Sequence, residues 1–329
     1  MSKMGNQLNE ILKQAYSEGL DKHSMKHSGT DETLRHVFTD DEYSQLKSTG
    51  NMLINYCRDN FEGVTKFYKI NSDMVQSFME DKAKTVAQST LNTYTANIHK
   101  LEVLISDKYP NSCGDLKWWE ETTTPISARS EAGKIRDVWA TEDQTNVILK
   151  YLDDNKDVIR SQVPLVFEVV CVTGMRVHEV LKMKPEDIKF HEDGRILEIH
   201  IIGKGGRPRD ITIESERLYE KLQDAIESKG LGQKDTFVNL TERGATKWMG
   251  ETMDKLNIKY DGMFKEIQSA GVCFHAWRKM VATNMAIELR EEGLNKREIC
   301  DRVADFLGHG DGRYNTWVTY IQGSVLASL

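Results

Sequence analysis

The sequence predicts a mainly α-helical protein with one small β-sheet, built as two domains. Apolar residues recur at helical spacing along most of the chain. Only two neighbouring segments alternate apolar and polar residues as β-strands do. The chain has 329 residues, more than the ~100 to 200 of an ordinary single domain. These three observations together define the predicted fold class.

Residues 1–120 are predicted to form a small all-helical domain. Apolar residues within 8–16 share one helical face. A capping box at Thr39 opens the second helix, because the Glu three residues later can bond back to the cap. The third and fourth helices are expected after Asn71 and from Ser89.

Residues 121–135 are predicted to link the two domains. This stretch lacks apolar periodicity and contains Pro125 and Gly133, which interrupt regular structure. The second domain is therefore expected to span residues 136–329.

The second domain is predicted to combine helices with one β-hairpin. A capping box at Thr141 opens its first helix, and a buried helix follows at 163–172. The strands 196–202 and 210–213 flank a turn with a basic tip. Four later helices are expected, at 241–256, 260–270, 275–291 and 295–307.

The composition argues against a membrane protein, a disulfide-rich protein and a zinc-binding protein. Hydrophobic residues make up 39% and charged residues 29%, as in ordinary globular proteins. No run of ~18 apolar residues is present and the N-terminus is polar, so we expect a cytoplasmic protein without a membrane partner. The cysteines form no Cys-x-x-Cys pair, which argues against a disulfide framework or a zinc site. They are Cys57, Cys113, Cys171, Cys273 and Cys300.

The net charge of -7, from 44 basic and 51 acidic residues, gives no indication of a nucleic-acid partner. Any such site must be a local basic patch on an acidic protein.

Three short segments carry polar residues that a purely structural helix does not need. Arg176 follows Gly174 at a predicted helix start, where an anion is favoured, and Glu179 on the same face could orient it. His275 and Arg278 lie one helical turn apart and can grip one anionic group. Taken singly, each has a structural alternative: a solvated arginine, or a capping histidine beside a surface arginine. The third segment, Leu307-Gly308-His309, can equally be a helix end that the imidazole stabilises.

Together, the order of these segments resembles that of the tyrosine recombinases, also called phage integrases. The family's Thr-Gly-x-Arg-x-x-Glu segment is matched at Arg176, its hairpin lysine by Lys204, and its His-x-x-Arg by His275 and Arg278. Its Leu-Gly-His is matched at His309. The resemblance covers the second half of the chain; the first half matches the family's core-type DNA-binding domain in size, helicity and position.

The family's nucleophilic tyrosine normally follows the last histidine by about nine residues. The ninth position here is Val318, and the nearest fitting tyrosine is Tyr320, two residues later. The Gly310-Asp311-Gly312 turn can absorb the excess. Tyr314 is the alternative nucleophile, and we expect Tyr320.

The resemblance implies a site-specific recombinase of mobile DNA that acts through a phosphotyrosine intermediate, with no metal, ATP or other cofactor. Arg176 and Arg278 would hold the phosphate, His275 would accept the tyrosine proton, Lys204 would protonate the leaving oxygen, and His309 would bond the phosphate. A type IB topoisomerase-like enzyme and a catalytically silent DNA-binding regulator are the alternatives.

Double-stranded DNA is the implied partner, bound at the nucleoid by a tetramer that joins two sites. The C-terminal tail would dock on a neighbouring subunit, and accessory proteins could bend the DNA. Residues 1–38 are too short for the arm-binding domain of some integrases. The candidate DNA-binding residues, each of which could equally be a solvated charge, are Lys82, Lys84, Lys100, Arg207, Arg209 and Lys279.

Overall fold

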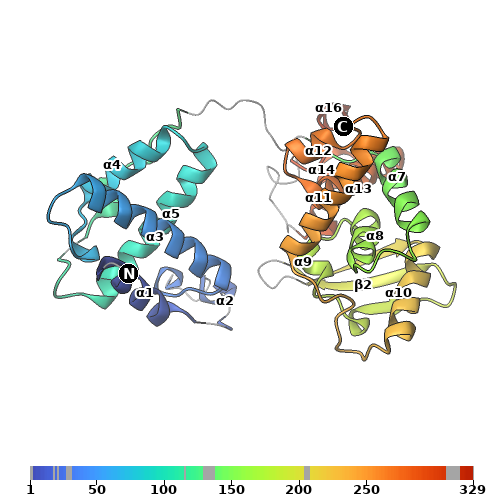
Figure 1. Ribbon diagram of the computed structural model, residues 1–329, viewed down its shortest axis with the longest axis horizontal. Coiled ribbons are helices and arrows are strands. Elements are labelled where there is room, and N and C mark those ends of the chain that lie inside the picture. Colours follow the sequence, from blue (N-terminus) through green and yellow to red (C-terminus); the bar gives the residue numbers. More distant parts are fainter. Residues whose placement is uncertain are drawn as a thin grey trace. The chain divides into compact units, whose positions relative to one another are not determined.

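The chain consists of two compact units, Met1–Gly133 and Lys134–Leu329, both drawn in Figure 1. Each is described by itself. The computed structural model describes residues 3–17, 19–20, 22–26, 32–114, 116–128, 138–203, 208–308 and 319–328.

The first unit is helical, as predicted. Its helices are α1 (Lys3–Ala15), α2 (Lys22–Lys26), α3 (Asp40–Asn60), α4 (Ser72–Ala83), α5 (Gln88–Lys108) and α6 (Trp118–Glu121). Thr39 Oγ1 accepts a bond from the Glu42 N–H at 3.1 Å, and Asn71 Oδ1 accepts one from the Met74 N–H at 3.0 Å. Only half of the predicted capping box at Thr39 forms, because the Glu42 carboxylate accepts from the Phe38 N–H at 2.9 Å and not from the cap residue. Leu8, Leu53, Phe78 and other fully buried side chains form one apolar core.

The first unit extends past residue 120. The Trp118 indole N–H donates to the Ile70 carbonyl at 2.9 Å, and the Ser127 hydroxyl donates to the Val86 carbonyl at 2.6 Å. The Ala128 N–H donates to the Ala83 carbonyl at 2.8 Å. Residues 121–128 of the expected linker therefore pack as part of the helical unit.

The second unit surrounds a small sheet with helices. Its helices are α7 (Glu142–Asp154), α8 (Val163–Thr173), α9 (Val177–Val180), α10 (Glu216–Lys229), α11 (Glu242–Lys259), α12 (Lys265–Ser269), α13 (Cys273–Glu291), α14 (Lys296–Phe306) and α16 (Gly323–Ser328). The predicted capping box of α7 is complete, with both reciprocal bonds between Thr141 and Gln144. Helix α10 and the short strand β1 were not predicted, and α12 is shorter than the expected 260–270 helix.

The sheet has three antiparallel strands in the order β1-β2-β3. They are β1 (Ile188–Phe190), β2 (Ile196–Ile202) and β3 (Pro208–Glu214). The predicted hairpin is therefore confirmed, in a register that pairs Ile199 with Ile211 and Ile201 with Arg209. Because side chains alternate along a strand, Arg209 shares the inward face with Ile211 and Ile213.

Helices α8 and α13 form the centre of the second unit (Figure 1). Phe167 of α8 meets Trp277 of α13 edge to face, with ring centroids 5.1 Å apart. The indole N–H of Trp277 donates to Thr145 Oγ1 at 3.0 Å, which satisfies the polar atom inside the core. This packing fixes the C-terminal end of α8 and the first turns of α13, where the candidate catalytic residues lie.

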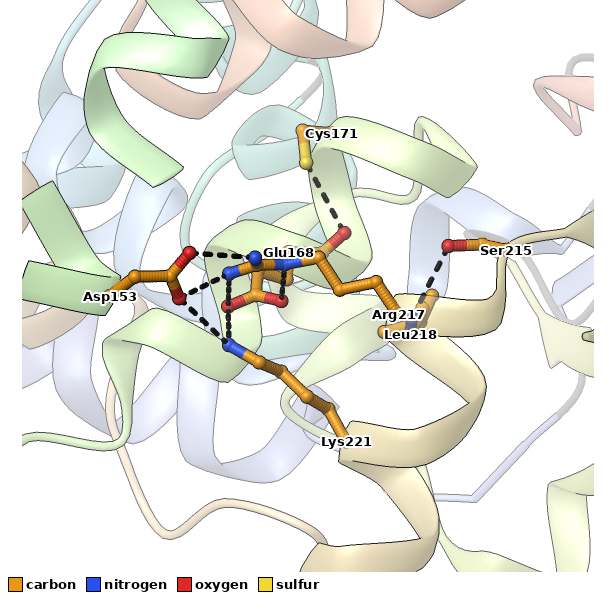
Figure 2. Close-up of polar contacts among 7 residues, drawn as sticks. All are labelled: Asp153, Glu168, Cys171, Ser215, Arg217, Leu218 and Lys221. Carbon is orange, nitrogen blue, oxygen red and sulfur yellow. Dashed lines mark hydrogen bonds and ion pairs between the residues drawn. The ribbon is translucent and has the colours of Figure 1, made fainter. Parts of the chain in front are cut away.

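An ion-pair network around the buried Glu168 connects α8 to its neighbours α7 and α10 (Figure 2). Glu168, only 2% exposed, accepts from Arg217 Nε at 2.9 Å and from the Lys221 ammonium. Arg217 also donates to both oxygens of Asp153, at 2.7 and 2.8 Å. Because the buried carboxylate has both cationic partners, its desolvation is compensated.

The C-terminal tail packs on its own subunit. Ile321 is buried, and Val325 and Leu326 are half-buried, in a cluster with residues of α13 and α14. Lys296 Nζ donates to the Leu326 carbonyl at 3.2 Å. Among the described residues, no helix combines the length and the apolar character needed to cross a bilayer.

Candidate active site

A left-handed glycine places Arg176 at the edge of a cleft. Gly174 ends α8 with φ of +64°, a conformation that costs other residues energy. A side chain at this position would also come within 3.2 Å of Val281 Cγ1. The turn directs the chain into α9, at whose start the Arg176 side chain is 21% exposed.

Glu179 organises two arginines from inside the protein. Its fully buried side chain accepts from the Arg176 backbone N–H at 2.8 Å and from Arg176 Nη1 at 3.1 Å. Arg209 donates through Nη1 and Nη2, at 3.2 and 2.8 Å. Burial alone raises the pKa of Glu179, but the bonds and charge of Arg209 and the Arg176 backbone bond outweigh it and hold the pKa at about 2. The expected contact between Glu179 and Arg176 is therefore present.

Arg278 is buried and held by backbone carbonyls. It is 1% exposed, and its Nη1 and Nη2 donate to the carbonyls of Gly174 at 2.5 Å and Leu307 at 2.6 Å. Its Nε is buried without a hydrogen-bond partner among the described residues. Burial, aided by the charge of Arg176, lowers the pKa of Arg278 to about 10, so the guanidinium remains charged at neutral pH.

Tyr320 lies against both His275 and Arg278. The His275 and Tyr320 rings meet edge to face with centroids 5.1 Å apart, and Arg278 Cζ lies 5.3 Å from the Tyr320 ring centroid. Thr283 anchors this segment: its hydroxyl donates to the Tyr320 carbonyl at 3.4 Å and accepts from the Gln322 N–H at 3.1 Å. Arg278 thus contacts both Gly174 and Tyr320, which are 146 positions apart in the sequence.

Arg176, His275 and Arg278 line one cleft with a volume of about 250 Å³. Its other wall contains Glu242 and Thr246 of α11, which were not among the expected site residues. Thr241, whose hydroxyl caps α11 through the Gly244 N–H at 3.1 Å, is the only sequence signal for this wall, and it marks a helix start rather than a site.

The remaining catalytic candidates, Lys204 and His309, lie outside the described residues, as do Arg207 and the alternative nucleophile Tyr314.

Three of the expected DNA-binding residues are largely buried. Lys100 is 5% exposed and donates to Glu42 at 2.8 Å, and burial lowers its pKa. Lys279 is 4% exposed. The Arg209 side chain is 9% exposed and bonded to Glu179. Because most of their surface is covered, these three side chains are poorly placed for a phosphate contact, and their assignment to DNA binding stays a prediction.

Lys82 and Lys84 remain on the surface of the first unit. Both pair with Asp81, at 3.3 and 3.6 Å, and the Lys84 side chain is 71% exposed. Such surface pairs are weak, so either lysine can exchange its partner for a phosphate.

A family model supplies the identification. The model described as the phage integrase family matches residues 139–323, more than half of the chain. The chain belongs to the phage integrase family. It is therefore a tyrosine recombinase, an enzyme that acts on DNA, and the topoisomerase-like and silent-regulator alternatives are not favoured.

Solved structures of recombinases share the fold of this phage integrase family member. One is a XerH site-specific recombinase bound to palindromic difH substrate in a post-cleavage complex, with a TM-score of 0.59, 16% identity and coverage of 96% of this chain and 80% of that chain. Another is a λ integrase tetramer bound to a Holliday junction, with a TM-score of 0.52, 14% identity and coverage of 96% and 78%. No curated protein matches the chain.

The pKa of Glu179 predicts how stability depends on pH in this integrase family member. The folded-state pKa of about 2 lies below the ordinary value of 4.5, so the stabilisation is complete above pH 4.5 and is lost as the pH falls toward 2. The stability advantage of wild type over Glu179→Gln should shrink by about 2 kcal/mol between pH 6 and pH 3. Calorimetric unfolding of both proteins across this range checks it, and a pH-independent difference would contradict it.

Proposed function

We propose that the protein is a site-specific recombinase that cuts and rejoins double-stranded DNA through a 3′-phosphotyrosine at Tyr320, without a metal ion or ATP. The observation that carries this proposal is the placement of the Tyr320 ring against His275 and Arg278. Arg278 is in turn bonded to Gly174, two residues before Arg176. The Tyr320 phenol thus lies beside His275 and Arg278, which line the cleft together with Arg176.

The phosphate requires fixed positive charge during the reaction. When the Tyr320 oxygen attacks phosphorus, the non-bridging oxygens gain negative charge in a five-coordinate state, and preorganised cations stabilise it. Arg176 and Arg278 present planar guanidiniums suited to phosphate oxygens, and neither has to lose a proton. Because Arg278 is held by two carbonyls, it needs little rearrangement to do so.

The protons move in opposite directions across the phosphate. An ordinary tyrosine has a pKa near ~10, so its proton must leave during attack, and His275 is the base beside the Tyr320 ring. As the bond from phosphorus to the 5′ oxygen breaks, that oxygen takes a proton from Lys204. His309 bonds a non-bridging oxygen.

Rejoining reverses this step. A 5′ hydroxyl attacks the phosphotyrosine, the bond to Tyr320 breaks, and the phenol regains its proton. One phosphodiester is exchanged for another, so no external energy is needed.

DNA contacts come from both units in this proposal. Lys82 and Lys84 of the first unit and Arg207 on the hairpin contact phosphates. A tetramer brings two duplexes together. In it, the C-terminal tail of each subunit docks on a neighbouring subunit, which breaks the contact of Leu326 with Lys296.

Accessory proteins bend the DNA, and the enzyme acts at the nucleoid in the cytoplasm. The XerH and λ integrase structures, both solved with DNA, support DNA binding by a protein with this fold.

The test is to trap and sequence the covalent complex. Purified protein is incubated with fragmented candidate DNA in EDTA, and DNA attached to protein is recovered and sequenced. We expect attached DNA that shares one cleavage position and forms equally well with and without EDTA. Adducts at random positions would contradict site specificity, and loss of adducts in EDTA would contradict the metal-free chemistry.

A further inference from the structure

Arg209 occupies an unusual place for an arginine of a basic hairpin. It lies second in β3, opposite Ile201, and faces inward with Ile211 and Ile213. Its side chain is 9% exposed, and both of its terminal nitrogens donate to Glu179. Its Nε is buried without a hydrogen-bond partner among the described residues. The bonds to Glu179 are therefore what hold this buried guanidinium in the described structure.

The backbone beside His309 packs directly on Arg209. A Cβ on Gly308 would lie 2.5 Å from Arg209 Nη1 and 3.1 Å from its Cζ, so a larger residue would require the guanidinium to shift. Gly308 also has φ of +70°, which independently favours glycine. Arg209 is thus fixed between Glu179 and the end of α14.

The charges around Glu179 do not cancel. Arg176, Arg209 and Glu179, which we call the Glu179 cluster, carry two positive charges and one negative charge. If Arg209 were absent, Glu179 would neutralise Arg176, and the carboxylate would compete with the phosphate for that guanidinium. Because Glu179 is fully buried, solvent and salt would screen this competition only weakly.

The hydrogen bonds to the Glu179 carboxylate are shared between the two arginines. Each oxygen of Glu179 accepts one bond from Arg176 and one from Arg209. Of the two bonds between Arg176 and Glu179, one comes from the Arg176 backbone and one from its Nη1. Since Arg209 satisfies the remaining carboxylate lone pairs, Glu179 orients Arg176 without enclosing its guanidinium.

We infer that Arg209 is a positioning residue that balances the charge of Glu179 and so keeps Arg176 available to the scissile phosphate. This inference rests on the proposed function, in which Arg176 binds that phosphate. Arg209 itself need not touch DNA.

Three variants separate charge balance from simple structural support. Arg209→Gln should slow single-turnover cleavage by ~10²-fold, because Glu179 would then neutralise Arg176, and losing one stabilising group at a developing oxyanion costs about that much. Arg209→Lys keeps the charge but loses the two parallel bonds to Glu179, so its cleavage rate should lie between those of Arg209→Gln and wild type. Glu179→Gln combined with Arg209→Gln removes both opposing charges, and should cleave at least about tenfold faster than Arg209→Gln alone. A purely structural role predicts a double variant no better than the single one.

Arg217→Gln is the matched control. Arg217 also pairs with a buried glutamate, Glu168, in the network of Figure 2, and its recorded partners there are Asp153 and Glu168. We expect a lower melting temperature but a wild-type cleavage rate for the folded protein. If Arg217→Gln slows cleavage as much as Arg209→Gln, the inference is overturned.

A measurement without DNA separates this inference from the proposed function. Carbon-13 NMR titration of the Glu179 carboxyl should show a higher pKa in Arg209→Gln than in wild type, because the main favourable partner of the carboxylate is gone. An unchanged pKa would overturn the inference even if the enzyme cleaves DNA. If wild type forms no adduct while the pKa rises as expected, the charge balance stands and the proposed reaction fails.

Discussion

Tyr320→Phe is expected to abolish covalent protein–DNA adducts on a nicked suicide substrate while DNA binding stays intact. The phenylalanine ring keeps the packing against His275 and Arg278 but lacks the attacking oxygen. Loss of a nucleophile typically removes at least ~10⁴-fold of the rate. Adducts are measured by denaturing gel, and binding by electrophoretic mobility shift.

Tyr314→Phe is the control for this prediction. It removes the other tyrosine near the chain end and should leave adduct formation close to wild type. If adducts persist in Tyr320→Phe and vanish in Tyr314→Phe, the nucleophile is Tyr314 and the proposed arrangement around Tyr320 is wrong.

Arg176→Lys should lose most cleavage activity even though it keeps the charge. Lysine is a point charge that cannot give the two parallel bonds of a guanidinium, and it would lose the geometry in which Glu179 Oε1 orients Nη1 at 3.1 Å. We expect a rate lower by ~10² to 10³-fold, with DNA affinity changed far less. Single-turnover cleavage at saturating protein measures this effect.

Arg195→Lys provides the matching control for Arg176→Lys. Arg195 is an exposed arginine that pairs with Glu214 at 3.2 Å, and its replacement by lysine should be neutral. Near-normal cleavage by Arg176→Lys would show that the phosphate does not need a bidentate grip at this position.

Helix starts and the hairpin could be predicted because their signals are local. The reciprocal bonds of Thr141 and Gln144 depend only on residues three apart, and the alternation along β2 is visible in the sequence. Strand β1 has three residues, too few to show any period. Helix α10 did carry a signal, since Ser215 caps it and Leu218 and Leu222 share its buried face.

Side-chain accessibility was harder to predict than secondary structure. The sequence suggests that Lys100 is a surface charge, because its partner, Glu42, is 58 positions away and the contact is not visible in the sequence. Arg209 was predicted to be a DNA-binding residue of the basic hairpin. Its position in register with Ile211 and Ile213 instead indicates a side chain that faces inward. The alternation was visible in the sequence. The partner that stabilises the buried Arg209 is Glu179 on α9, and only the folded structure shows that the two side chains meet.

The convergence of the candidate catalytic residues follows from packing rather than spacing. The sequence separates His309 from Tyr320 by two residues more than the family pattern, so Tyr320 was predicted as the nucleophile with Tyr314 as the alternative. In the structure, Thr283 bonds the backbone at Tyr320 and Gln322, and the Tyr320 ring reaches His275. Tyr314 lies outside the described residues, so the choice of Tyr320 as nucleophile stays a prediction, supported by the contact of its ring with His275 and Arg278.

Mass spectrometry of the DNA-linked peptide tests the proposed chemistry most directly. The trapped complex is digested with trypsin and nuclease, and the peptide that retains a nucleotide is fragmented. Cleavage after Arg313 gives residues 314–329, which contain both Tyr314 and Tyr320, so fragment ions must locate the phosphate. The account predicts a 3′-phosphate linked to the oxygen of Tyr320. A phosphate on Tyr314, on any other residue, or at a 5′ end would contradict it.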